Sequence, residues 1–405
     1  MALERQNYPD GYFPKDEYEA RWKKVHAEMK KRKYDIAIVW GKTAGHYERA
    51  METLWLTNFW SEHSGQEPDS PIWNARGFCC VILEPGSEPE VHGDMPAGKR
   101  KWVHCGKYVF SNDPIESVGK ALKRRRLQGK VAFVGSDNLP VKYAKQLEKM
   151  TPGITYHFDD DLVRECRRIK SARELDMYRE CGRIVSSALY RLCDSLYAGK
   201  IAAEAAADAA HEIARRGGMW LRIPINFGSD KESVYFERDP MYGYPQYAPK
   251  PGDVCRTWIY GPLHQGYWID PGRTLVCGGR PTKAQKSLIE DSYAITQAVL
   301  DNVKHGVKVL DVIKKVDEVK KRVVTEYDHS ADQWPYNGHG NGMLWEHPII
   351  NRDCVSDKDY FEEGMVCSGE SFMTRKGVGS AGWEQNYLVT KSGIELITTT
   401  PVFWY

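Results

Sequence analysis

The sequence lacks the features that mark nucleic-acid-binding, membrane-spanning or secreted proteins. Its 57 Lys and Arg residues are balanced by 55 Asp and Glu residues, which leaves a formal net charge of +2 at pH 7. Such a balance provides no positive field for nucleic acid or an anionic membrane. No run of about 18 apolar residues is present to cross a bilayer, and the first residues lack the apolar core of a signal peptide. We therefore expect a cytoplasmic protein that acts on a small-molecule substrate, with neither nucleic acid nor membrane as partner.

Paired cysteine motifs are also missing. The ten cysteines are scattered, Cys79 and Cys80 are adjacent, and no C-x-x-C pair occurs. This distribution fits neither a zinc knuckle nor the disulfide framework of a small secreted domain. We expect reduced thiols that are mostly buried.

The length of the chain predicts two domains, because 405 residues exceed what one hydrophobic core usually organises. The pattern changes near Arg164, beyond which Ser171 and Glu174 have the spacing of a capping box that starts a helix. We therefore expect an α/β domain over residues 1–164 and a second domain over residues 165–405.

Periodicity and turn residues outline the elements of both domains. Apolar residues recur at helical spacing between Tyr18 and Met29, which predicts an amphipathic helix. Strands are expected at residues 35–40, 78–83, 90–92 and 131–134 in the first domain. In the second domain, helices are expected from Ser171 toward Tyr190 and at residues 202–216 and 283–304, and strands at residues 254–260, 266–276, 365–374, 387–390 and 394–398.

Four segments of residues 165–405 each place one metal-ligand type in a glycine-rich or strand context. These residues are Asp270 in GYWIDPGRT, His339 in GHGNG, Glu370 in EGMVCSGE and Glu384 in EQNYLVT. Each segment by itself is weak evidence for a metal site, since a lone acidic residue at a strand end is usually a surface residue. In this order, and together with residues 168–174, they resemble the creatinase, aminopeptidase P and prolidase family of pita-bread metallopeptidases.

The resemblance implies a fold and a metal site. It implies an α/β N-terminal domain and an α+β pita-bread catalytic domain, with the site on the concave face of a curved sheet. Family metallopeptidases bind two ions through two Asp, one His and two Glu, and the first Asp would lie eleven positions before Asp270, at Ile259. Since Ile cannot coordinate, we expect one divalent transition-metal ion, Mn, Fe, Co or Zn, held by the other four residues. A metal-free site, as in creatinase, is the alternative.

Other positions depart from the peptidase pattern. Where the family's peptidases carry an entrance His, this chain has Tyr235, and where they carry a second helper His it has Glu346, followed by His347. We predict Glu346 as the general acid or base, with Tyr235 and His347 as helpers. The structural alternatives are that Glu346 caps a turn or pairs with an arginine and that Tyr235 is a packing residue.

Aromatic residues crowd the same segments. Large rings beside carboxylates make a pocket for a small organic cation through cation–π attraction. The predicted substrate-binding residues are Trp258, Trp268, Tyr336, Trp345 and Trp383. The alternative for each ring is packing in the core of the sheet.

These departures favour a non-peptidase member, similar to creatinase and to the DddP-type dimethylsulfoniopropionate lyases. We expect a metal-dependent hydrolase that directs a metal-activated water at a C–N bond of a small, cationic or amide-containing metabolite. The first alternative is a lyase of the DddP type, with proton abstraction and elimination to acrylate. The second is an Xaa-Pro dipeptidase or aminopeptidase. The resemblance also implies a homodimer.

Overall fold

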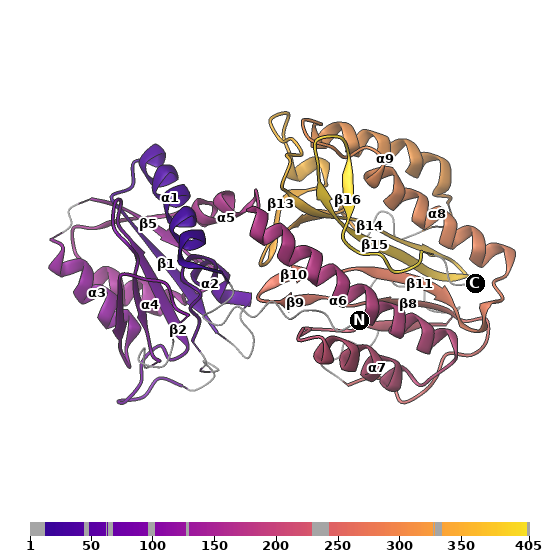
Figure 1. Ribbon diagram of the computed structural model, residues 1–405, viewed down its shortest axis with the longest axis horizontal. Coiled ribbons are helices and arrows are strands. Elements are labelled where there is room, and N and C mark those ends of the chain that lie inside the picture. The colour runs from indigo at the N-terminus through magenta and orange to yellow at the C-terminus, as the bar shows by residue number, and fades with distance from the viewer. Residues whose placement is uncertain are drawn as a thin grey trace. The chain divides into compact units, whose positions relative to one another are not determined.

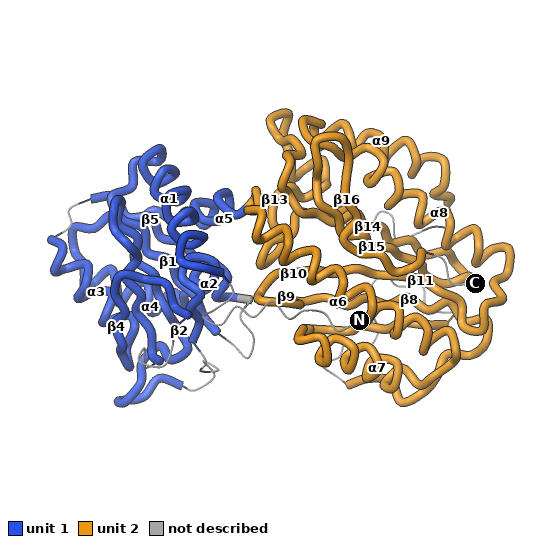
Figure 2. The backbone as a smooth tube through the Cα atoms, viewed as in Figure 1, with its two compact units in different colours: residues 1–167 blue, residues 168–405 orange. Residues whose placement is uncertain are grey.

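The computed structural model divides into two compact units, Met1–Arg167 and Arg168–Tyr405 (Figure 2). It describes residues 13–43, 48–61, 63, 68–95, 102–126, 129–228, 243–326, 328 and 334–402. The division lies three residues beyond the boundary that the sequence places before residue 165. Among the described helices, none is long and apolar enough to cross a membrane. All ten cysteines are free thiols, and most of them are buried.

The first unit is a mixed sheet with helices packed against it (Figure 1). Its strands, in the order β4-β3-β2-β1-β5-β6, are β1 (Ile36–Lys42), β2 (Phe78–Leu83), β3 (Glu90–Gly93), β4 (Lys107–Phe110), β5 (Lys130–Val134) and β6 (Thr155–Phe158). Its helices are α1 (Lys15–Arg32), α2 (Met51–Thr57), α3 (Pro114–Arg124), α4 (Val141–Met150) and α5 (Asp161–Arg167). Strand β1 is almost entirely buried because it lies inside the sheet, antiparallel to β2 and parallel to β5.

The second unit is built on an antiparallel sheet of eight strands. Its strands are β7 (Ile225–Phe227), β8 (Val254–Trp258), β11 (Gly272–Val276), β12 (His339–Asn341), β13 (Trp345–Ile349), β14 (Val366–Arg375), β15 (Gly379–Val389) and β16 (Ile394–Leu396), in the order β13-β12-β14-β15-β11-β8-β7 with β16 beside β15. A hairpin of β9 (Gly261–His264) and β10 (Tyr267–Ile269) stands apart from this sheet. The helices are α6 (Ala172–Tyr197), α7 (Ala202–Arg215), α8 (Lys283–Leu300) and α9 (Val309–Val323).

Several boundaries differ from the sequence expectation. The capping box is confirmed, since the Ser171 hydroxyl accepts from the Glu174 N–H and the Glu174 carboxylate accepts from the Ser171 N–H. The single strand expected at residues 266–276 was wrong, because the chain leaves the β conformation at residues 270–271 and resumes it as β11. Strand β15 begins eight residues before the expected residue 387, since its first half is rich in small residues and shows no apolar alternation.

Strands β14 and β15 separate the hydrophobic core from the face that carries the carboxylates. On β14, Gly369 packs against α8 and Ser371 donates to the Ser292 carbonyl of that helix. Because side chains alternate along a strand, Glu370 projects from the opposite face. On β15, Trp383 lies in the core with the apolar side chains of α8 and α9, and Glu384 therefore shares a face with Glu370.

Candidate metal centre

Strand register gathers the four predicted ligands on one face of the sheet. Glu370 of β14 lies directly opposite Glu384 of β15, and Glu384 lies opposite Gly272 of β11. Asp270 ends the segment before β11, and His339 is the first residue of β12, the strand beside β14. Four segments distant in sequence thus deliver one side chain each to the same place.

The four side chains form a buried cluster around the His339 ring. Its Nε2 atom lies 3.4 Å from Asp270 Oδ2, 3.5 Å from Glu384 Oε1 and 3.8 Å from Glu370 Oε1. None of the four residues is more than 3% exposed. The His339 Nδ1 atom lies 3.1 Å from the Gly340 carbonyl, which can only accept, so Nδ1 donates to it and Nε2 is the ring nitrogen that faces the carboxylates.

Indole and amide N–H groups surround Asp270. Trp268 and Trp345 donate their indole N–H to Asp270 Oδ2 at 2.8 and 3.0 Å. Asn386 and Asn341 donate their amide N–H to Oδ1 at 2.9 and 3.4 Å. Both oxygens of Asp270 are therefore held in place by neighbouring side chains.

Three buried atoms of the cluster have no hydrogen-bond partner within the described part of the chain. They are His339 Nε2, Glu370 Oε1 and Glu384 Oε1. Open acceptor atoms this deeply buried are destabilising unless a cation or donor satisfies them. Protein N and O ligands bind Zn²⁺ at about 2.0–2.2 Å, which places two tetrahedral ligand atoms roughly 3.3–3.6 Å apart. The distances from His339 Nε2 to Asp270 and Glu384 fall in this range, whereas Glu370 Oε1 lies outside it at 3.8 Å. Asp270, His339 and Glu384 form a buried group whose ligand atoms all lie within 4.8 Å of one another and could hold one ion.

Electrostatics also favour a cation here. Burial raises the pKa of Glu370 to about 8, against the opposing influence of His339. Burial and the charge of Asp270 together raise the pKa of Glu384 well above its ordinary value. Burial opposes ionisation of Asp270 too, but His339 and hydrogen bonds with Glu384 and Trp268 hold its pKa at about 2. Three adjacent buried carboxylates therefore do not all ionise unless a positive ion lies between them.

Aromatic rings line the approach to this cluster. Trp345 stacks on His339 with ring centroids 4.3 Å apart, and Tyr336 contacts both rings edge-on at 5.9 and 6.2 Å. Trp345 is 45% exposed, so this ring borders solvent as well as the cluster. On the other side, Trp258 stacks on Phe372 at 4.8 Å and donates its indole N–H to Glu384 Oε2 at 2.8 Å.

Trp383 must be removed from the predicted binding set. It is adjacent to Glu384 in β15, so strand alternation turns its ring to the opposite face of the sheet. There it packs edge-on against Tyr293 and donates to the Ile289 carbonyl of α8. Trp383 is a core residue, in agreement with the structural alternative for this position.

The predicted catalytic residues lie in three different surroundings. Glu346 alternates with Trp345 on β13, points away from the cluster and forms a buried ion pair with Lys170 at 2.7 Å. The prediction that Glu346 transfers protons at the site was therefore wrong, and the partner is a lysine instead of an arginine. His347 is exposed and lies on the same face of β13 as Trp345. Tyr235 lies outside the described residues.

Sequence reasoning missed Asn341, Asn386 and Lys170. Each asparagine is two positions after a predicted ligand, His339 or Glu384, and so shares its face of a strand. The spacing of two residues, visible in the motifs GHGNG and EQNYLVT, could have indicated that each asparagine lies on the same face as the ligand. No local signal linked Lys170 to a strand that follows it by more than 170 residues.

Ile259 occupies the position implied for the first Asp ligand. It is fully buried, and its N–H donates to the Pro271 carbonyl at 3.1 Å. The backbone therefore keeps the position beside Asp270, but an apolar side chain is present where the family metallopeptidases carry a ligand.

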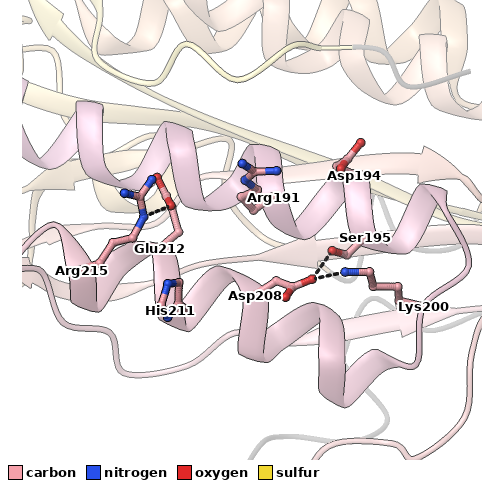
Figure 3. Close-up of a pocket in the computed structure, with 8 residues that line it drawn as sticks. All are labelled: Arg191, Asp194, Ser195, Lys200, Asp208, His211, Glu212 and Arg215. Carbon is pink, nitrogen blue, oxygen red and sulfur yellow. Dashed lines mark hydrogen bonds and ion pairs between the residues drawn. The ribbon is translucent and has the colours of Figure 1, made fainter. Parts of the chain in front are cut away.

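A cavity of about 410 Å³ lies between α6 and α7 and shares no residue with the cluster (Figure 3). It is lined by Arg191, Asp194, Ser195, Lys200, Asp208, His211, Glu212 and Arg215. Ser195 and Lys200 both donate to Asp208, at 2.6 and 2.7 Å, and Arg215 donates to Glu212. These charges neutralise one another at the surface, so we assign the chemistry to the buried cluster.

Comparisons with known proteins agree with this fold. The putative dipeptidase YkvY of Bacillus subtilis is 24% identical over 374 residues, which cover 89% of this chain and 96% of that protein. The Xaa-Pro dipeptidase of Pyrococcus horikoshii is 25% identical over 304 residues, 72% of this chain and 80% of that protein. The crystal structure of prolidase from Thermococcus sibiricus superposes with a TM-score of 0.77 at 16% identity and covers 96% of this chain and 99% of that one.

The predicted fold class, an α/β unit followed by a pita-bread unit, is confirmed by these neighbours. The sequence model of Metallopeptidase family M24 matches residues 176–391, more than half of the chain. A buried cluster of carboxylates and one imidazole is what a metallopeptidase needs to bind its ion. The chain therefore belongs to metallopeptidase family M24 and is an enzyme of the hydrolase class.

Proposed function

We propose that this protein is a hydrolase that uses one divalent transition-metal ion to cleave a C–N bond of a small substrate. The observation that carries the proposal is the buried group of Asp270, His339 and Glu384, whose ligand atoms all lie within 4.8 Å of one another and which includes the open atoms His339 Nε2 and Glu384 Oε1. When bound, such an ion polarises a carbonyl group and makes water acidic enough to attack at neutral pH.

The surrounding side chains have separate tasks in this proposal. Asp270 supplies a fixed negative charge, held by four N–H donors, that favours a cation in the cluster. The exposed imidazole of His347, beside Trp345 on β13, is in position to give a proton to a leaving group. The buried shell excludes bulk water, which strengthens each of these electrostatic interactions.

The aromatic rings beside the cluster favour a small substrate that carries a positive charge. Trp345 and Tyr336 present ring surfaces next to His339, and Trp345 borders solvent. A positive group that lies over such rings is stabilised by about 0.5–2 kcal/mol per ring. An amide-containing cation, with its C–N bond over the cluster, satisfies both the rings and the carboxylates. Hydrolysis of Xaa-Pro dipeptides is the second candidate, favoured by the names of the relatives above.

A substrate panel separates the candidates. The metal-loaded protein is assayed against cationic amides, guanidinium compounds, Xaa-Pro dipeptides and sulfonium carboxylates. We expect release of an amine with uptake of one water, and cleavage of Xaa-Pro dipeptides at no more than a background rate. Formation of an alkene that absorbs in the ultraviolet identifies the DddP-type elimination instead and contradicts the proposal.

Two variants test where the activity comes from. Glu384→Gln removes an open ligand atom, and we expect loss of both bound metal and turnover. Glu212→Gln is the matched control, because Glu212 is an equally buried carboxylate that belongs to α7 and not to the cluster. Equal losses in both variants would mean that the activity follows folding and not the proposed centre.

A further inference from the structure

The unit Met1–Arg167 contains a serine, a histidine and a glutamate that are joined by hydrogen bonds. The Ser117 hydroxyl oxygen lies 2.7 Å from His92 Nδ1, and His92 Nε2 lies 2.8 Å from Glu90 Oε1. None of the three belongs to the candidate metal centre. A serine within reach of an imidazole, which is in turn oriented by a carboxylate, is the arrangement that activates a hydroxyl as a nucleophile.

One strand and one helix bring the three side chains together. Glu90 and His92 are two positions apart on β3, so both project from the same face of that strand. Helix α3 packs against β2 and β3 and carries Ser117. The Asp113 side chain caps α3 by accepting from the Glu116 N–H. This cap fixes the start of the helix, and with it the direction in which Ser117 meets His92.

The three groups differ in burial. His92 is fully buried and Glu90 is 7% exposed, whereas Ser117 is half-buried. Glu116 and Lys120, which lie near Ser117 on α3, are exposed. The hydroxyl therefore borders solvent, with the imidazole and the carboxylate behind it. A small electrophile can reach Ser117 from the surface, while the base stays shielded from bulk water.

Electrostatics set the protonation state of the imidazole. The hydrogen bond from His92 lowers the pKa of Glu90 well below its ordinary 4.5, and Arg125 adds to this effect against the influence of burial. An ionised carboxylate only accepts, so His92 Nε2 donates to Glu90. Burial lowers the pKa of His92 below 6.5, helped by the charges of Lys107 and Arg125 and opposed by Glu90. The ring is thus neutral at pH 7, and its Nδ1 atom accepts from the Ser117 hydroxyl, as a general base must.

We infer that Ser117 is a nucleophile that His92 activates and Glu90 orients, and that it takes the acyl group of a small ester. The Ser117 Oγ atom forms a bond to the carbonyl carbon of the ester, and its proton moves to His92 Nδ1. Glu90 stabilises the imidazolium. The bond between the carbonyl carbon and the alkoxy oxygen then breaks, and Nδ1 gives the proton to that oxygen, so that an alcohol leaves. Water attacks the acylated serine in the same way, which releases a carboxylic acid and restores the hydroxyl. No step uses the candidate metal centre.

Acylation of the whole chain by p-nitrophenyl acetate tests the inference. A chelator is present throughout, so that a metal ion does not consume the ester. We expect release of p-nitrophenolate and an acetyl group on Ser117, located by peptide mass spectrometry. His92→Gln should slow this acylation by about 100-fold or more, the range for loss of a general base. Acetylation of lysines alone, or of Ser117 at an equal rate in His92→Gln, overturns the inference.

Two serine variants control the assignment. Ser117→Ala should abolish the acetylated peptide and leave the unfolding midpoint nearly unchanged, because alanine is a strong helix former. Ser136→Ala is the matched control, since the Ser136 hydroxyl donates to a carboxylate, that of Asp160, and its loss should not change the acylation rate. An equal fall in both variants would contradict a role for Ser117.

A thiol at position 117 gives a second measurement that does not require removal of the buried ring. In Ser117→Cys, an imidazole within hydrogen-bond reach should lower the pKa of the new thiol. We expect iodoacetamide to alkylate position 117 at about pH 6.5 at least 10-fold faster than the exposed thiol of Cys354, as measured by peptide mass spectrometry. Alkylation no faster than that of Cys354 would show that His92 does not activate a nucleophile at this position.

Discussion

Single residues decide whether the indole donors reach the carboxylates. Trp258 of β8 lies directly opposite Gly272 of β11. Its indole ring passes over the backbone of Gly272 and donates its N–H to Glu384. A Cβ atom at position 272 would overlap the Trp258 ring, so only glycine is compatible with this path. The GYWIDPGRT motif thus contains a glycine whose role is to make room for an indole.

Gly272→Ala should displace the Trp258 ring and lower the free energy of unfolding by about 1–3 kcal/mol, as overpacking does. Denaturant unfolding measures the loss, and the tryptophan emission spectrum reports the changed environment of the indole. Gly393→Ala is the control, because no atom lies within 4 Å of a Cβ at that position. A change at Gly393 as large as that at Gly272 would exclude steric overlap as the cause.

Motifs in the sequence identified the residue types of the site but not the direction in which each side chain points. Asp270, His339, Glu370 and Glu384 were found because each lies in a motif that resembles a family pattern. Glu346 was misassigned because position 346 corresponds to a helper histidine in that pattern, whereas the direction of its side chain depends on the register of β12 and β13. A spacing in sequence does not show which face of a strand a side chain occupies when a bulge intervenes.

At the scale of elements, a buried ion pair links the start of α6 to β13. Lys170 precedes the capping box of α6, and Glu346 lies beside Trp345, with each side chain 2% exposed. Removal of one partner leaves an uncompensated charge in a buried position, which is more destabilising than loss of both.

Lys170→Met should therefore destabilise the protein by about 3–5 kcal/mol, and the double variant Lys170→Met/Glu346→Leu should recover much of that loss. Urea denaturation of both variants gives the comparison. Arg168→Met serves as the control, since its partner Glu362 is 41% exposed and such pairs contribute only about 0–1 kcal/mol. If the double variant is no more stable than the single one, the uncompensated charge is not the cause.

Helices α6 and α7 are held together by Glu212. Its buried carboxylate accepts from Ser187 of α6 and from Arg215 and Arg216 at the end of α7. Burial opposes ionisation, but these donors hold the pKa of Glu212 at about 2, below the ordinary 4.5. Because the folded-state pKa is depressed, the stabilisation is complete above about pH 4.5 and is lost as the pH falls toward 2.

Glu212→Gln should lower the free energy of unfolding at pH 7 by about 1.5–3 kcal/mol, the range for hydrogen bonds to charged groups. The difference from the wild type should shrink as the pH falls from 4.5 toward 2, as measured by urea midpoints across that range. Glu318→Gln, at a 63% exposed carboxylate paired with Lys315, should show little change at any pH. A difference at Glu212 that is constant with pH would mean that its ionisation contributes nothing.

At the scale of the whole molecule, the proposed ligands all belong to the unit Arg168–Tyr405. A ligand that binds only the folded state stabilises it by mass action, about 2.7 kcal/mol at a free concentration one hundred times the Kd. The stabilisation should therefore act on the second unit and not on Met1–Arg167.

Removal of metal by a chelator should lower the unfolding temperature of the second unit by about 5–10 °C, given its size. Differential scanning calorimetry measures the shift, and hydrogen exchange assigns it to residues of one unit. His339→Ala should unfold at the chelated temperature with or without added ion. A shift confined to Met1–Arg167 would contradict the placement of the site.

The sequence by itself determined the family, the fold class and four members of the cluster, because these depend on motifs that are local in the chain. It also indicated one ion through Ile259. Only the tertiary structure decided which side chains face the cluster, because that depends on strand register and alternation. Thus Trp383 became a core residue and Glu346 a partner of Lys170. The donors Asn341 and Asn386 emerged in the same way, since hydrogen bonds between distant strands form only when the sheet brings them together.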